Sequence, residues 1–346
     1  MVLVLEEDVI TAMKSPEFQI FDFISRGDLH SLSSLLDKYP LSHRISNWDK
    51  QSPLHIACRV GNLEIVKRLL DLGADPNSVD KLGMTPLMEA CSTGNLDIMK
   101  VLVEANADID AVTISRQTLL WFATLHGFPE AVSYLLDELK IDPNAAREDG
   151  VTPLMVASSQ GFETIADLLI NAGADVNAMD LQNTTALINA AEHGSTMIVS
   201  LLLHSGAHVN IFTENNFTPL IISSAHGHLE SVQKLVDAGA AVDLDHPDGV
   251  TALMYASAAG HLDIVKYLIS SGSNVNAVHS MGGTALLETT AAPHSSENTA
   301  QIVMTLLDAG ARVNAVDNEG ISPIISASAI GNEKVIRYSY LSFDRV

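Results

Sequence analysis

The sequence has few aromatic and few basic residues. Phe, Trp and Tyr make up 5% of its 346 residues, and 19 Lys and Arg stand against 42 Asp and Glu, so the net charge is −23. An acidic surface repels phosphate backbones and anionic lipids. We therefore expect no nucleic-acid partner and no membrane insertion. Two interpretations of the charge stay open: solubility of a large surface, or attraction for protein partners with basic segments.

Long apolar runs are also missing. No stretch reaches membrane-spanning length. The apolar residues 1–5 run directly into Glu6, Glu7 and Asp8, which is unlike a signal sequence. With only 2 cysteines, the composition favours a reducing compartment. The expected location is cytoplasmic or nuclear.

Motifs for chemistry are absent as well. There is no GxGxxG and no Walker-type phosphate loop. There is no HExxH or CxxC, and no Ser/His/Asp or Cys/His arrangement stands out among the 13 histidines. We expect no catalytic residue, no metal and no cofactor, and hence no enzyme.

What is present is one phrase that returns every 33 or 34 residues. Its clearest copy is Thr-Pro-Leu-Met-Glu-Ala at 85–90, and its nine copies begin at Ser52, Thr85, Thr118, Thr152, Thr185, Thr218, Thr251, Thr284 and, after a longer step of 38 residues, Ser322. Self-similarity at this period indicates stacked small units that cannot fold alone.

Each part of the phrase has a physical role in starting and ending a helix. The Thr or Ser hydroxyl can cap the first turn, and Pro suits the first helical position. A Gly such as Gly94 ends this helix, and a second helix follows with apolar residues at helical spacing, as in Leu63, Ile65 and Val66. A turn that ends in Gly, such as 80–83, leads into the next copy.

The sequence closely resembles the ankyrin-repeat family. It shares that family's period of 33, its order of turn, helix, short loop and helix, and three motifs: T-P-L-H-x-A, the step G-H-L or G-N-L, and the ending L-L-x-x-G-A-D-V-N. The resemblance implies an all-α fold: one curved solenoid array of helix-turn-helix units with short β-hairpin-like loops. It also implies a protein-binding module with no activity of its own. Cys58 and Cys91 hold equivalent positions in neighbouring units, where packed helices are about 8–10 Å apart, so we expect two buried thiols rather than a disulfide.

The period divides the chain into an N-terminal extension at 1–16 and an array of about ten units at 17–346. We predict units at 17–49 (a divergent N-terminal cap), 50–82, 83–115, 116–149, 150–182, 183–215, 216–248, 249–281, 282–319 and an incomplete last unit at 320–346.

Three units depart from the pattern. The unit at 116–149 carries Trp121 and Phe122 at usually small or polar positions, and one extra residue at 138–141 displaces the Gly that should end its second helix. The unit at 282–319 has an insertion at 291–299, which is either tolerated drift or a partner contact. In the last unit, Tyr338, Tyr340, Leu341 and Phe343 either improvise a cap or mark one end of a longer array.

In ankyrin arrays the hairpin tips and first helices form a concave groove that binds partners. The repeat pattern leaves certain tip and first-helix positions free, and exposed apolar side chains among them are typical of interaction surfaces. Two alternatives remain open: Trp48 packs on the capping unit, and Trp121 belongs to the core. The candidate partner-binding residues are Trp48, Arg59, Lys81, Leu82, Met84, Ile114, Trp121, Leu125, His126 and Phe217.

An Asn recurs in the stretch after the second helix. In this family some Asn at that position are hydroxylated by an asparaginyl hydroxylase, and the alternative is that each Asn bridges neighbouring hairpins. The candidates are Asn77, Asn177, Asn210, Asn276 and Asn314.

The function that the resemblance implies is a protein-interaction scaffold. Alternatives of another class are a substrate-recruiting or regulatory part of a larger protein or complex. These include a ubiquitin-ligase adaptor, the cytosolic array of a channel, and a regulator of a kinase, phosphatase or proteasome.

Overall fold

A computed structural model of the chain describes residues 15–39, 45–244, 248–292 and 297–329, together with 331, 333 and 336. All regular structure in these residues is helical. Contacts between residues divide the chain into two compact units, one formed by Met1–Ala157 and Thr164–Asp175 and the other by Ser158–Glu163 and Val176–Val346. None of the helices in the described part combines the length and the apolar character that crossing a membrane requires.

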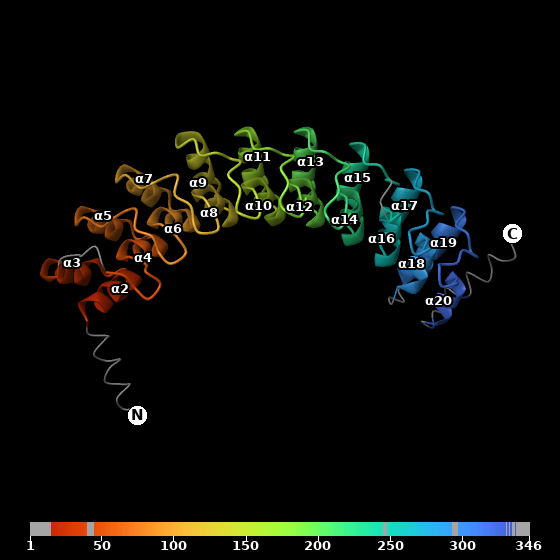
Figure 1. The fold of residues 1–346 in the computed structure, drawn as a ribbon, viewed down its shortest axis with the longest axis horizontal. Helices are drawn as coiled ribbons and strands as arrows, with labels where there is room; N and C mark the ends of the chain where they lie inside the picture. Colours follow the sequence, from red (N-terminus) through yellow and green to blue (C-terminus); the bar gives the residue numbers. More distant parts are fainter. Residues whose placement is uncertain are drawn as a thin grey trace, which may run out of the picture. The chain divides into compact units, whose positions relative to one another are not determined.

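In the first unit, helices come in pairs that stack side by side (Figure 1). The first helices α4, α6 and α8 contact one another in succession, and α5 contacts α7 in a second row. The helices are α2 (Pro16–Arg26), α3 (Leu29–Lys38), α4 (Pro53–Val60), α5 (Leu63–Asp71), α6 (Pro86–Thr93), α7 (Leu96–Glu104), α8 (Leu119–Leu125) and α9 (Pro129–Ser133). Where the two units divide lie α10 (Pro153–Gln160) and α11 (Glu163–Asn171).

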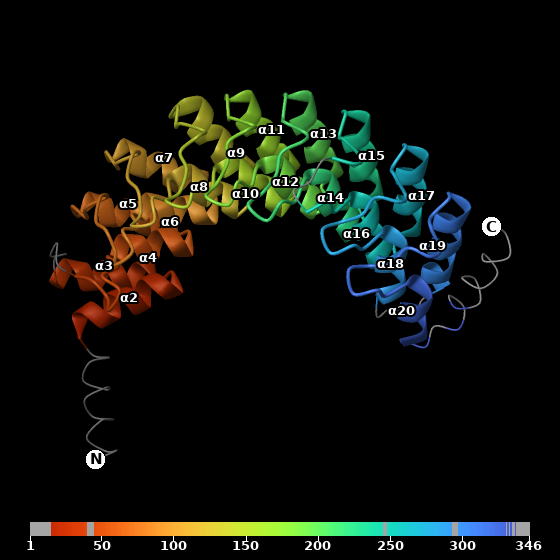
Figure 2. The same cartoon turned by 45° about the vertical axis from the view of Figure 1, so that its right-hand side comes forward.

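The second unit repeats the two-row arrangement (Figure 2). Successive first helices α12, α14, α16, α18 and α20 are in contact, as are the second helices α13, α15, α17 and α19. Their bounds are α12 (Ala186–Glu192), α13 (Thr196–His204), α14 (Pro219–His226), α15 (Leu229–Asp237), α16 (Ala252–Ala259), α17 (Leu262–Ser270), α18 (Ala285–Ala291), α19 (Glu297–Asp308) and α20 (Pro323–Ala329). The helix pairs follow the period of the sequence.

The recurring phrase forms the start of each first helix. Thr85 Oγ1 accepts a hydrogen bond from the Met88 N–H at 3.3 Å, and Thr251 Oγ1 accepts one from the Met254 N–H at 3.3 Å. Such a cap is worth about 1 kcal/mol. Behind each cap, a Leu such as Leu87 and an Ala such as Ala90 are fully buried, so the small Ala lets neighbouring helices approach closely.

The tips between helix pairs are turns joined by a ladder of backbone hydrogen bonds. Lys81 N–H donates to the Asp49 carbonyl at 3.0 Å, and Ile114 N–H donates to the Leu82 carbonyl at 3.0 Å. The same bond recurs in the second unit, where Glu214 N–H donates to Gln182 at 3.0 Å. Each tip therefore fixes the position of the next.

The extra residue predicted at 138–141 is taken up by a π-helical turn. After α9, residues Tyr134–Glu138 form η1, and the Leu139 N–H donates to the Tyr134 carbonyl at 3.2 Å. Lys140 then takes the left-handed conformation (φ +55°) that a Gly adopts in most other repeats, for example Gly173 (φ +92°). The wider turn absorbs one residue without removing Leu135 and Leu136 from the core.

Several sequence predictions fall partly outside the described residues. These are the extension at 1–16, of which only Ser15 and Pro16 are described, the centre of the insertion at 291–299, and most of the second half of the last unit. Ser15 caps α2, because its Oγ accepts a hydrogen bond from the Phe18 N–H at 3.2 Å.

Candidate functional site

The candidate site begins with a row of exposed apolar side chains at the tips of the first unit. Trp48 is 93% exposed, Leu82 65% and Ile114 72%. They belong to three successive tips, at 45–52, 78–85 and 111–118, and the backbone ladder described above holds those tips in register. We call Trp48, Leu82 and Ile114 the tip row. Exposed apolar residues on ordered backbone are characteristic of interaction surfaces, since little conformational entropy is lost on docking.

At 93% exposure, Trp48 makes little contact with the capping unit. It lines an open cavity of about 520 Å³, to which Phe18 and Phe21 of α2 and Ile56 of α4 also contribute. An aromatic side chain at the rim of an apolar cavity is a common anchor for a partner residue.

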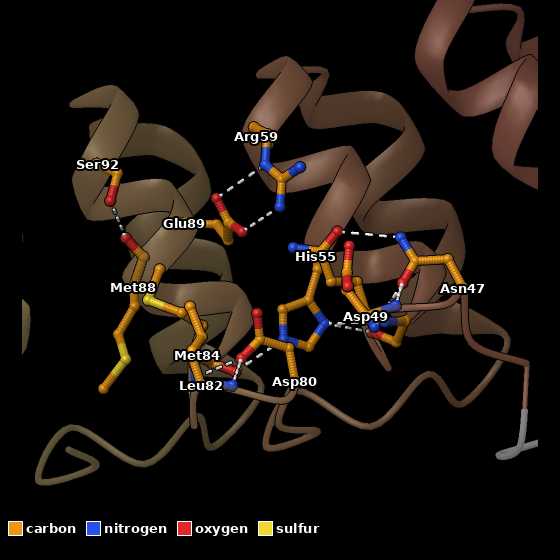
Figure 3. A network of polar contacts seen from close by, with 12 residues as sticks. Asn47, Asp49, His55, Arg59, Asp80, Leu82, Met84, Met88, Glu89 and Ser92 are labelled. Carbon is orange, nitrogen blue, oxygen red and sulfur yellow. Dashed lines mark hydrogen bonds and ion pairs between the residues drawn. The ribbon is translucent and has the colours of Figure 1, made fainter. Parts of the chain in front are cut away.

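Behind the tip row lies a network of polar contacts between α4 and α6 (Figure 3). Arg59 Nε donates to Glu89 Oε2 at 3.1 Å, and Arg59 Nη2 pairs with Glu89 Oε1. The Glu89 side chain is 8% exposed and that of Arg59 45%. The hydrogen bond to Glu89 raises the pKa of the Arg59 guanidinium, and the charges of Asp80 and Asp49 act in the same direction.

His55 occupies the centre of this network and joins one repeat to the next (Figure 3). It is fully buried; its Nε2 lies 2.9 Å from the Met84 carbonyl, and its Nδ1 accepts from the Ser52 N–H at 3.1 Å. These partners fit the neutral ring with its proton on Nε2, which donates to Met84. Burial lowers the pKa of His55 and keeps the ring neutral.

The remaining candidate residues differ in how far they can reach a partner. Lys81 and His126 are exposed, whereas Met84 and Leu125 are half-buried. Phe217, in the second unit, is half-buried and lies against Tyr255 with ring centroids 5.6 Å apart.

Trp121 lies in the core, which is one of the two alternatives that the sequence allows. It is 6% exposed, packs edge-on against Phe122 with centroids 5.2 Å apart, and is covered by the guanidinium of Arg147 at 5.4 Å. Trp121 therefore has little surface with which to contact a partner. The equivalent residues of most other repeats, such as Met88 and Ile188, are likewise apolar and buried.

The recurrent Asn side chains bridge neighbouring loops. Asn77 Nδ2 donates to the Asn106 carbonyl at 3.0 Å, and its Oδ1 accepts from the Asp108 N–H at 2.7 Å. The same pair of bonds, to the loop of the following repeat, is made by Asn177, Asn210 and Asn276 and also by Asn144, which the sequence prediction omitted. Asn314 is exposed. The bridge explains the recurrence of Asn, and hydroxylation of these residues stays a prediction.

The two cysteines are free and buried, as expected. Burial raises the pKa of both thiols, that of Cys58 helped by the nearby Glu89, so neither is activated as a nucleophile. Among the described residues, no group of three or more His, Cys, Asp or Glu side chains is placed to hold a metal ion. The exposed His193 and His226 instead contact carbonyls of their own helices, at 2.9 Å each.

The second unit holds a site that sequence reasoning missed. Glu288 of α18 pairs with His279 at 3.0 Å beside a cavity that Tyr255 and Met281 also line. The signal for it was in the repeat: Glu288 stands at the position of Glu89, four residues after the capping Thr.

Comparison with known proteins agrees with this architecture. A family model described as "Ankyrin repeats (3 copies)" matches residues 21–113, 112–180, 178–245 and 220–301. The chain is also similar to the E3 ubiquitin-protein ligase XB3 of Oryza sativa subsp. japonica, with 36% identity over 74 residues. That similarity covers 21% of this chain and 16% of the ligase. Ankyrin repeats indicate a protein-interaction module, and from the extent of the match to the family model the chain belongs to the ankyrin-repeat family.

Proposed function

We propose that this protein binds other proteins through the face that its hairpin tips and first helices form. The observation that carries the proposal is the tip row: Trp48, Leu82 and Ile114 are 93%, 65% and 72% exposed on tips that a backbone ladder holds in place. A face that is ordered before binding loses little entropy when a partner docks. The proposal assigns the chain no catalysis and no cofactor.

The net charge of −23 suggests which partners bind. An acidic surface attracts basic segments and raises their rate of association at low ionic strength. We propose proteins with basic segments as partners, in the cytoplasm or nucleus, and no nucleic acid.

The test is a peptide-display selection on the full chain, followed by binding measurements on the enriched peptides. We expect Trp48→Ala and Leu82→Ala each to weaken binding at least about tenfold, as for a central apolar anchor, while thermal unfolding stays nearly unchanged. Met197→Ala is the matched control, since Met197 is 63% exposed on the second helix α13.

Equal losses of binding and of thermal stability in the tip variants would mean that Trp48 and Leu82 are structural. Peptides that bind all variants alike, including Met197→Ala, would contradict the proposal that the tip row is the binding surface.

A second candidate is recruitment of substrates to a ubiquitin ligase, favoured by the similarity to the ligase XB3 over 74 residues. It predicts that the chain binds a substrate and a ligase component at the same time. Two-colour pull-down with a selected peptide tests it: a ligase component that the peptide displaces would contradict recruitment, because one face would then serve both.

A further inference from the structure

In the second unit, the tips and first helices of the repeats at 249–281 and 282–319 line a cavity of about 340 Å³. Its walls combine the apolar side chains of Met254 and Met281, the ring of Tyr255, and the carboxylate of Glu288. Ala258 and His279 also line the cavity, and no Lys or Arg does.

The same place in the first unit is filled by an arginine. Arg59 stands seven residues after the capping Ser52, and the residue seven after the capping Thr251 is Ala258. The carboxylate opposite is kept in both regions, because Glu89 and Glu288 each stand four residues after the Thr of the following repeat.

A further acidic residue is also kept. Asp49 and Asp248 each stand three residues before the capping residue of their repeat. Asp49 lies close enough to Arg59 to act on its charge, and Asp248 lines the cavity. In the first unit the charge of Asp49 raises the pKa of Arg59. Two of the three carboxylates that raise the pKa of Arg59, those of Glu89 and Asp49, therefore have counterparts in the second unit, whereas the third, Asp80, is replaced there by His279.

The exposure of the two glutamates reflects this difference. The Glu89 side chain, under the guanidinium of Arg59, is 8% exposed, whereas that of Glu288 is 38% exposed. His279 Nε2 contacts Glu288 Oε1 at 3.0 Å. A carboxylate accepts about four hydrogen bonds, so this contact orients Glu288 and leaves it able to accept more.

The contact between His279 and Glu288 depends on Gly283. A Cβ at this position would lie 2.1 Å from His279 Nε2 and 2.5 Å from Glu288 Oε1. The equivalent residue of the first unit is Met84, whose carbonyl faces His55. The repeat at 282–319 is thus built to keep Glu288 turned toward the cavity.

We propose that this cavity binds an arginine side chain of the partner protein, a specificity that rests on the proposed function. The partner's guanidinium takes the place that Arg59 fills in the first unit and pairs with Glu288. Its apolar stem lies along Met254 and Met281, and its plane lies against Tyr255. The planar guanidinium suits bidentate pairing with a carboxylate, so arginine binds better than lysine.

The test uses N-acetyl-arginine amide as the probe and the full chain with labelled methionine methyl groups. We expect the methyl signals of Met254 and Met281 to shift in a saturable manner, with an affinity on the order of millimolar for so small a ligand. N-acetyl-citrulline amide, which has the same shape without the charge, should shift neither signal. Absence of these shifts with the arginine probe, or equal shifts with citrulline, would overturn the proposal.

Three variants locate the effect. Glu288→Gln should weaken binding of the arginine probe at least about tenfold, because the variant lacks the charged hydrogen-bond acceptor. Ala258→Arg should abolish binding of the probe, because the new side chain occupies the position that Arg59 holds in the first unit.

Ser92→Arg is the matched control: Ser92 holds the same helix position, with Phe122 in place of the glutamate opposite. It should leave binding unchanged, and thermal unfolding should show all three folded.

The outcomes separate this inference from the proposed function. Displayed peptides that bind through the tip row while the arginine probe shifts no methionine would overturn the arginine site alone. If the tip-row variants bind the peptides as the wild type does while the probe still shifts the methyl signals of Met254 and Met281, the role of the tip row is overturned and the arginine site is supported.

Discussion

Two regions of the molecule use one arrangement of residues in different ways. In the repeats at 50–115, His55 and the Arg59–Glu89 pair fill the space between first helices with internal contacts. In the repeats at 249–319, Met254 and Ala258 stand at the positions of His55 and Arg59, and a cavity of about 340 Å³ lies beside Glu288. The comparison shows that small changes at fixed repeat positions replace a polar network with a cavity beside a carboxylate.

The largest expected effect is on His55. His55→Met introduces the residue of the later repeat. It leaves the Ser52 N–H without its partner and removes one of the two hydrogen bonds to the Met84 carbonyl, which still accepts from the Asp80 N–H at 3.0 Å. We expect a loss of roughly 2–3 kcal/mol in the free energy of unfolding near pH 7.5, measured by urea unfolding.

The His55→Met effect should also depend on pH. The pKa of His55 is lowered from its ordinary value of 6.5 by burial. The unfolded chain therefore binds more protons, and the wild type loses stability as the pH falls from 6.5 toward the folded pKa. The difference in free energy of unfolding between wild type and variant should therefore become smaller as the pH is lowered from about 7.5 to about 5.5. A gap that stays constant would contradict a neutral buried His55.

Arg59→Ala is expected to have the next largest effect. It leaves the Glu89 carboxylate, whose side chain is 8% exposed, without its counter-charge. Because the guanidinium is itself half-exposed, we expect a loss of about 1–2 kcal/mol rather than that of a fully buried pair. The matched change in the later repeats is Ala258→Arg, which should cost no stability. If both variants unfold at the wild-type urea concentration, the Arg59–Glu89 pair contributes nothing to stability.

The smallest expected effect is that of Lys50→Gly, at the left-handed residue of the tip. Lys50 and Gly249 hold equivalent positions and both are left-handed, with φ of +62° and +71°. A Cβ on Gly249 would lie 2.8 Å from the Val278 carbonyl oxygen. We expect Gly249→Ala to lower the free energy of unfolding by roughly 1–2 kcal/mol, and Lys50→Gly to change it by less than about 1 kcal/mol. If calorimetry finds the same loss of stability for both variants, the two tips leave equal space for a side chain at this position.

Local features of the fold could be predicted from the sequence. Capping Thr and Pro residues, Gly at helix ends and apolar spacing act within a few residues of the chain, so they place each helix pair without knowledge of the rest. The phrase that begins at Thr85 and the Leu and Ala inside it gave the cap and the buried face of α6 directly. The free, buried thiols of Cys58 and Cys91 followed from the same period.

Other features depended on contacts between repeats, and only the tertiary structure decided them. The same kind of sequence evidence suggested exposure for Trp48 and Trp121, yet one is 93% exposed and the other 6%. The cause is that Trp121 lies on a helix facing its neighbours, whereas Trp48 lies on a tip that projects beyond the helices. The pairing of Arg59 with Glu89, and the cavity where Ala258 replaces that arginine, were decided in the same way. Side chains 30 residues apart meet only when stacking brings their repeats together.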